Sequence, residues 1–155
     1  MSLPAFYPDA ARRALPLALT LLLGLPLAAF AAVPLPQVLI GLWRVADSAC
    51  KGCDPSQGAE TGAEVRLAVR GTQNPFGTDC GGTLEVEAQA PEPWPAVQAR
   101  LGLPARWLAP AGPAPAQAWR LVCGGVAQET VILVDPDTLL LPGEAGNVLR
   151  LRRAR

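Results

Sequence analysis

The chain has 155 residues, in which 13 Lys and Arg balance 13 Asp and Glu, with four Cys and no His. Because there is no excess of positive charge, the composition does not predict binding to nucleic acid or to anionic lipid. The absence of histidine excludes a Ser-His-Asp triad, a Cys-His pair and histidine metal ligands. We therefore expect a protein that binds rather than catalyses and that uses no metal or other cofactor.

Residues 1–31 have the three parts of a secretory signal peptide. Arg12 and Arg13 precede an apolar run at 14–27, and small residues precede a cleavage site at the end of the segment. An uncleaved anchor is the alternative, because residues 14–33 are about as long as a membrane span. The prolines within this run favour cleavage. We expect an exported protein, periplasmic or secreted, with no stable membrane span after cleavage.

Residues 32–37 form a proline-rich segment, here called the N-terminal arm, ahead of a single domain at 38–155. Its apolar residues are Val33, Pro34, Leu35 and Pro36. Proline restricts the backbone, so such an arm loses little entropy when it binds a partner. The alternative is a plain spacer between the cleavage site and the domain.

The clearest strand patterns alternate apolar and polar residues. In 64–70, Val65, Leu67 and Val69 are predicted to share one face, and residues 83–88 repeat the pattern. A slip of one residue would bury charged side chains, so the register of both strands is well specified.

The other predicted elements complete an antiparallel meander. A strand is expected at 38–45 and a short helix at 94–101. Four tail strands are expected at 118–123, 129–134, 138–141 and 148–152. Gly-Gly, Asp-Pro-Asp and Gly-rich turns join the tail strands, and short joints indicate antiparallel neighbours. About seven strands with at most one short helix predict an all-β fold, a small antiparallel barrel or a sandwich.

Four cysteines in an exported chain of this size predict two disulfide bonds. We expect Cys80–Cys123 as a long clamp and Cys50–Cys53 as a local loop. The rival arrangement joins Cys50 or Cys53 to Cys80 and so connects the first predicted strand to the third.

The Cys-x-x-Cys motif at 50–53 also has functional interpretations, which its neighbours disfavour. A redox site needs a helix that begins at the first cysteine and lowers the pKa of its thiol. Gly52 inside the motif disfavours such a helix. Covalent haem attachment needs a histidine where Asp54 stands, and a four-cysteine zinc site normally has a second such motif.

Two tryptophans and three aspartates are further candidates for a site. Trp94 and Trp107 lie in proline-rich segments and are candidates for lining a barrel mouth around a ligand, although capping of the core from outside is the favoured alternative. Asp47, Asp54 and Asp79 lie near strand ends and could form a pair of carboxylates for acid–base chemistry. Polar loop positions explain these aspartates equally well.

The Gly-Leu-Trp sequence at 41–43, together with the arginine-rich C-terminal strand, resembles the pattern of lipocalin-like barrels. The resemblance implies an up-and-down antiparallel barrel in which a guanidinium stacks on the tryptophan and closes one end. It pairs Trp43 with Arg152, and less favourably with Arg150 or Arg153.

The chain also resembles a group of small exported bacterial barrels through Trp-Arg-Val at 43–45, Cys80, Cys123 and Leu-Gly-Leu at 101–103. It is similar as well to periplasmic inhibitors of secreted metalloproteases, whose N-terminus enters the protease cleft. The expected barrel architecture, in a chain without histidine, favours a disulfide-stapled protein that binds a small apolar ligand or lipid. The alternative is a module that inhibits an exported hydrolase through the arm or the barrel loops.

Overall fold

The computed structural model describes residues 32–50, 61–73, 79–143 and 146–155. The predicted signal peptide at 1–31 lies outside these ranges, as do Cys53 and Asp54. The strands are β1 (Val33–Pro34), β2 (Gly41–Cys50), β3 (Glu64–Leu67), β4 (Arg70–Gln73), β5 (Cys80–Ala88), β6 (Gln117–Cys123), β7 (Val126–Asp135), β8 (Thr138–Pro142) and β9 (Asn147–Arg153). The named helices of the described ranges are α1 (Trp94–Leu101) and a one-turn 3₁₀ helix, η2 (Ala105–Trp107).

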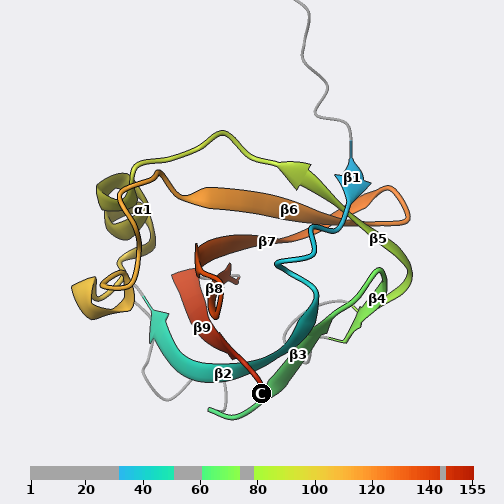
Figure 1. Ribbon diagram of the computed structural model, residues 1–155, viewed down its shortest axis with the longest axis horizontal. Coiled ribbons are helices and arrows are strands. Elements are labelled where there is room, and N and C mark those ends of the chain that lie inside the picture. The colour runs from blue at the N-terminus through green and yellow to red at the C-terminus, as the bar shows by residue number, and fades with distance from the viewer. Residues whose placement is uncertain (1–31, 51–60, 74–78, 144–145) are drawn as a thin grey trace, which may run out of the picture.

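Strands β2 to β9 form a closed antiparallel barrel of eight strands (Figure 1). Each strand pairs with the next along the chain, and β9 pairs with β2 to close the ring. The predicted all-β, up-and-down barrel with one short α-helix is therefore confirmed. None of the helices in the described ranges is long and apolar enough to cross a membrane.

The inside of the barrel is a packed hydrophobic core. Alternate residues of the strands point inward and are nearly inaccessible to solvent. They include Trp43, Val45, Val65, Leu67, Leu84, Val86, Leu121, Val131, Leu139, Leu141, Leu149 and Leu151. Close packing of this kind leaves side chains, rather than an open lumen, in the middle of a small barrel.

One predicted strand is two strands in the structure. The segment 64–70 breaks into β3 and β4, because the chain reverses at a tight turn in which the Ala68 N–H donates to the Gly71 carbonyl. Gly71 has a φ of +93°, a conformation that glycine adopts at little cost. Val69, expected on the inner face, therefore lies in the turn and is exposed.

The N-terminal arm packs against the barrel instead of extending away from it. In Figure 1 the chain from β1 crosses one end of the ring before it enters β2. Val33 and Pro34 pair with Val86 and Glu85 of β5, and Leu35 is buried in the barrel core. β4 is short and pairs with β5 only between Cys80 and Thr83. The same edge of β5 is therefore free at Glu85 and Val86, and β1 pairs with it there.

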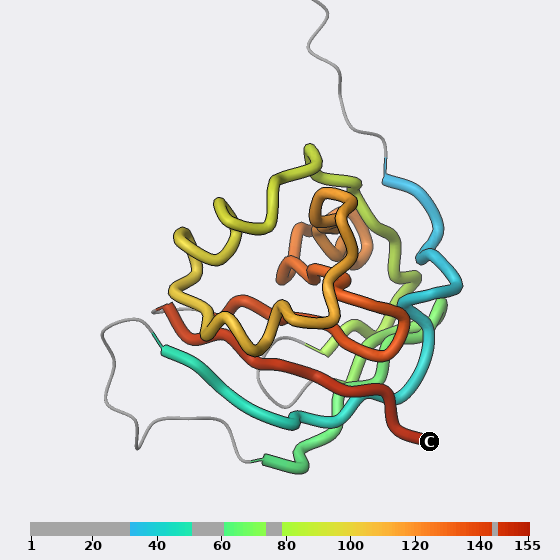
Figure 2. Tube along the Cα trace, turned by 60° about the vertical axis from the view of Figure 1, so that its left-hand side comes forward, coloured from blue at the N-terminus to red at the C-terminus, as the bar shows by residue number. Residues whose placement is uncertain are grey.

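A second hydrophobic cluster lies on the outside of the barrel. Its buried members are Val97, Leu103, Trp107, Ala116, Ile132, Val134, Leu140 and Val148. The segment that contains α1 and η2 lies along the outer face of β7, β8 and β9 (Figure 2). The helix occupies the predicted range and ends at Gly102, whose φ of +66° stops it. The part of the wall beneath this segment is consequently buried on both faces.

Candidate functional site

Trp43 and Arg153 close one end of the barrel. The Arg153 guanidinium carbon lies 4.2 Å from the centre of the Trp43 ring, and the indole N–H donates to the Leu39 carbonyl at 2.9 Å. Arg153 also donates from Nη1 to the Ile40 carbonyl (2.9 Å) and from Nη2 to the Val38 carbonyl (2.5 Å). The arginine thus holds both the tryptophan and the chain that leads into β2.

The arginine on the tryptophan ring is Arg153, where we expected Arg152. The cause is the two-residue period of a strand, which places Leu151 and Arg153 on the same face. Trp43 and Arg153 are direct cross-strand partners, whereas Arg152 is paired with Arg44. Arg152 points outward, where its Nη1 donates a hydrogen bond to Thr138 Oγ1.

Neither Trp94 nor Trp107 lines a barrel mouth. Trp107 is fully buried in the outer cluster, and its indole N–H donates to Asp47 Oδ2 at 2.9 Å. Trp94 is half-buried and packs against the same cluster. Both rings therefore cap the barrel wall from outside, which was the alternative to ligand lining.

The carboxylates expected near the strand ends do not form a pair that the structure describes. Asp47 accepts the Trp107 indole hydrogen bond, and the Arg106 guanidinium lies 3.7 Å from its Oδ2. Asp79 lies elsewhere, beside β4 and β5, and Asp54 falls outside the described residues. In the described ranges, no group of three or more acidic or cysteine side chains is placed to hold a metal ion.

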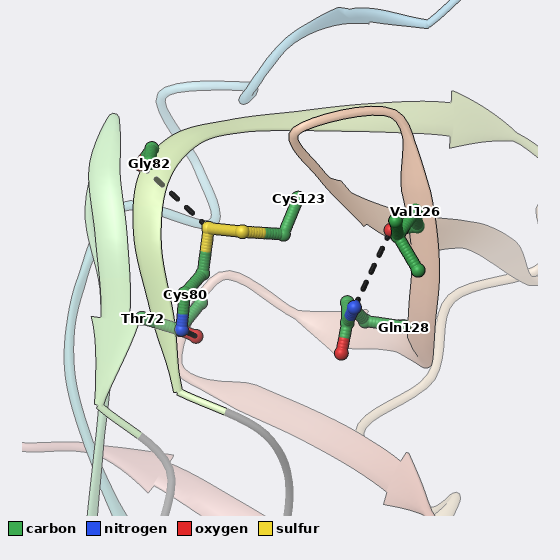
Figure 3. The surroundings of a disulfide bond; sticks show 6 residues. All are labelled: Thr72, Cys80, Gly82, Cys123, Val126 and Gln128. Atoms are coloured by element: carbon green, nitrogen blue, oxygen red, sulfur yellow. Dashed lines mark hydrogen bonds between the residues drawn. A yellow bond between two sulfur atoms is a disulfide. The ribbon is translucent and has the colours of Figure 1, made fainter.

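A disulfide bond joins Cys80 at the start of β5 to Cys123 at the end of β6, with 5.8 Å between the Cα atoms (Figure 3). The Cys80 N–H donates to Thr72 Oγ1 at 3.2 Å, which ties the same residue to β4. The predicted long clamp therefore exists. The predicted Cys50–Cys53 loop lies outside the described residues, because Cys53 does.

A hollow lies between α1 and the outer faces of β6 and β7, and we call it the α1 pocket. Its volume is about 420 Å³, within the range of small-molecule sites. The lining residues are Gln89, Ala90, Glu92, Val97, Arg100, Ala116, Ala118, Thr130, Ile132 and Pro142. Small and apolar side chains dominate this set, with four polar or charged groups among them.

An ion pair crosses one side of the α1 pocket. The Arg100 guanidinium donates to both Glu92 carboxylate oxygens, at 2.6 Å from Nη2 and 3.3 Å from Nε. This hydrogen bonding lowers the pKa of Glu92, so the pair stays ionised at a more acidic pH than a free glutamate would. A backbone bridge between Glu92 and Ala116 holds the carboxylate in place, because it fixes residue 92 beside the start of β6.

Sequence reasoning missed the α1 pocket. Its walls come from segments that are distant in sequence, so no motif marks it. One signal was present: Val131 to Val134 and Leu139 to Leu141 are continuous apolar runs, which are typical of strands buried on both faces. Such runs predict that another segment packs on the outer face of these strands. A hollow can then form where the edge of that segment meets the strands.

Comparison with known proteins adds no relative from which a site could be transferred. No family model matches the chain, and no curated protein or solved structure matches it.

Proposed function

We propose that this protein is an exported, disulfide-stapled lipocalin-like barrel that binds a small, largely apolar ligand and does not catalyse a reaction. The ligand occupies the α1 pocket on the outer wall instead of the barrel interior. One observation carries the proposal: a hollow of about 420 Å³ lies outside a barrel whose interior is filled by side chains.

The chemistry of the α1 pocket supports an apolar ligand with one polar end. Val97 and Ile132 offer branched apolar surface, and Ala118 leaves space beside them. Gln89 and Thr130 supply uncharged hydrogen-bonding groups in the same lining. Because Arg100 already binds Glu92, no free charge in the lining selects a strongly ionic ligand.

Export is supported by two independent features. The sequence of residues 1–31 fits a signal peptide. The Cys80–Cys123 bond is of a kind that persists in oxidising compartments outside the cytosol. A periplasmic or secreted location follows as part of the proposal.

The alternative function is inhibition of an exported hydrolase through the N-terminal arm. Val33 and Pro34 are paired with β5 and Leu35 is buried, so the arm would have to leave the barrel before it could enter a cleft. Because the arm would lose this pairing and the burial of Leu35, we favour ligand binding over inhibition.

The test uses protein expressed from the full sequence in a bacterial host that exports it. Native mass spectrometry would reveal a co-purifying ligand, and calorimetric titration with decanol would measure affinity for an uncharged apolar probe. We expect Ala90→Leu, which fills the pocket, to weaken decanol binding at least tenfold. Ala99→Leu is the matched control, because Ala99 is exposed on α1 and does not line the pocket.

Equal decanol affinity in the two variants would place any binding outside the α1 pocket. The absence of both a co-purifying ligand and decanol binding would overturn the proposed function.

A further inference from the structure

A second pocket lies on the opposite wall, over the outer face of the β3–β4 hairpin, and we call it the hairpin pocket. Its volume is about 410 Å³, and its lining includes Arg66, Arg70 and Gln73. It shares no residue with the α1 pocket. The hairpin pocket is therefore a separate candidate site with a different chemistry.

The strand pairing explains why Arg66 and Gln73 share one face. Val65 and Leu67 are buried in the barrel core, so Arg66 between them points outward. Gln73 is the direct cross-strand partner of Arg66 in β4, and partners across a ladder lie on the same face. Arg66 and Gln73 therefore stand together at one side of the hollow.

Small residues keep the floor of the hairpin pocket open. Ala68, Gly71 and Gly81 all line it. A Cβ atom at Gly71 would collide with the Cys80 carbonyl oxygen, so β4 approaches β5 more closely than a side chain would permit. A Cβ atom at Gly81 would meet nothing within 4 Å, which shows open space above that residue.

The two arginines of the hairpin pocket differ from most other arginines of the described ranges. Seven of those lie within 4.0 Å of a carboxylate oxygen, for example Arg44 beside Glu64. Neither Arg66 nor Arg70 has such a partner among the described residues. With Asp79 as the one carboxylate in the described lining, the pocket carries a net charge of about +1 at neutral pH.

We propose that the hairpin pocket binds a phosphate or sulfate group, with the guanidinium groups of Arg66 and Arg70 donating to its oxygens. Guanidinium groups form short, charge-assisted pairs of hydrogen bonds with such oxyanions. The Gln73 amide supplies a further donor from the facing strand. The open floor at Gly81 leaves room for the rest of a phosphate ester.

The experiment is a titration of the isotope-labelled protein, expressed from the full sequence, followed by amide NMR at constant ionic strength. Inorganic phosphate, sulfate and glycerol 3-phosphate replace chloride in separate series. We expect the Gly71, Gln73 and Gly81 amides to shift and those of the distant Gly124-Gly125 turn to stay unchanged. A tighter fit for glycerol 3-phosphate would identify an ester, and an equal or tighter fit for the inorganic ions would identify a free anion.

The variants separate the site from general surface attraction. Arg66→Gln and Arg70→Gln should each weaken phosphate binding at least fivefold, whereas Arg44→Gln should leave it unchanged. Gly81→Leu should block binding sterically, and Gly82→Leu is its matched control, because Gly82 is also exposed and does not line the pocket.

Phosphate affinity that is equal in the Arg66, Arg70 and Arg44 variants would overturn the proposal. Amide shifts that spread over all exposed arginines, or Gly81→Leu protein that binds phosphate as tightly as the Gly82→Leu control, would overturn it as well. None of these outcomes bears on the α1 pocket, so this inference and the proposed function can fail separately.

Discussion

The two walls of the barrel are built differently. Where α1 and η2 cover them, strands β7, β8 and β9 are buried on both faces, since their inner side chains enter the barrel core and their outer side chains there enter the cluster under α1 and η2. Beyond this cover the outer face of β9 carries Arg152, which is exposed. Strands β3, β4 and β5 are buried only on the inner face, and their outer face carries Arg66, Arg70 and other polar groups. The first wall lies between the barrel core and the covering segment of α1 and η2, whereas the outer face of the second wall is in contact with solvent.

This difference shows where each wall obtains its stability. The covered wall has apolar side chains in two clusters and strands of 10, five and seven residues. On the open wall β3 and β4 have four residues each, too short to bury much surface. The open wall is reinforced instead by the Cys80–Cys123 bond and by β1, which covers the free edge of β5.

The two proposed sites follow the same division. Where a covering segment meets the covered wall, the crevice at its edge is lined by apolar and small residues. Where the open wall bends at the β3–β4 turn, the hollow is lined by polar and charged groups. A difference in layer structure thus becomes a difference in ligand chemistry.

Removing Trp107 should have the largest effect on stability. Trp107→Ala deletes a fully buried ring from the outer cluster and leaves Asp47 without its indole donor. We expect a loss of about 3–5 kcal/mol in the free energy of unfolding, measured by urea denaturation. The amides of α1 should lose hydrogen-exchange protection before those of β3 and β5.

The control for this variant lies on the open wall. Thr83→Ala changes an exposed position of β5, and we expect a change of no more than about 0.5 kcal/mol. If Trp107→Ala cost less than 1 kcal/mol, the cover would be dispensable and the covered wall would be no more stable than the open one.

Removing the disulfide should weaken the open wall. In Cys80→Ala/Cys123→Ala, a closure between residues 43 apart in sequence is lost, and we expect the free energy of unfolding to fall by about 2–4 kcal/mol. Hydrogen-exchange protection should fall first in β4 and β5 and persist in α1, β7 and β8. Earlier loss of protection in α1 would show that the bond does not reinforce the open wall selectively.

The open wall was the easier of the two to predict from sequence. The alternation of Val65 and Leu67 with Glu64 and Arg66 specifies a strand with one buried face, and this is what β3 is. The turn at 68–71 was missed because Val69 continued the alternation, although it lies in the turn itself. A two-residue period cannot distinguish one long strand from two strands joined by a tight turn.

The covered wall was predicted as strands but not as a layer beneath other segments. Periodicity reports which residues of a strand are apolar, not what covers them, and the cover here comes from a proline-rich stretch that has almost no period. The α1 pocket depends on that tertiary contact, so it could not be predicted from local pattern. The Cys80–Cys123 bond was predictable because both cysteines lie at the ends of strands that pair with each other.

The expected pairing of Trp43 with Arg152 shows how a resemblance can suggest the correct interaction and the wrong residue. Resemblance to lipocalin-like barrels suggested an arginine over the tryptophan, and the structure has one. The strand period, carried from Leu149 and Leu151, points to Arg153 on the inner face. Applying that period to the last strand would have corrected the assignment.

Arg153 and Arg152 therefore offer the finest test of how the barrel end is closed, with the smallest expected effect. Arg153→Met keeps much of the side-chain volume but removes the contact with the Trp43 ring and the hydrogen bonds to the Val38 and Ile40 carbonyls. We expect a loss of about 1–3 kcal/mol in the free energy of unfolding. Arg152→Met removes an outward-facing guanidinium and should cost less than half as much. An equal or larger loss for Arg152→Met would mean that contacts on the outer face of β9, rather than the contact of Arg153 with the Trp43 ring, stabilise this end of the barrel.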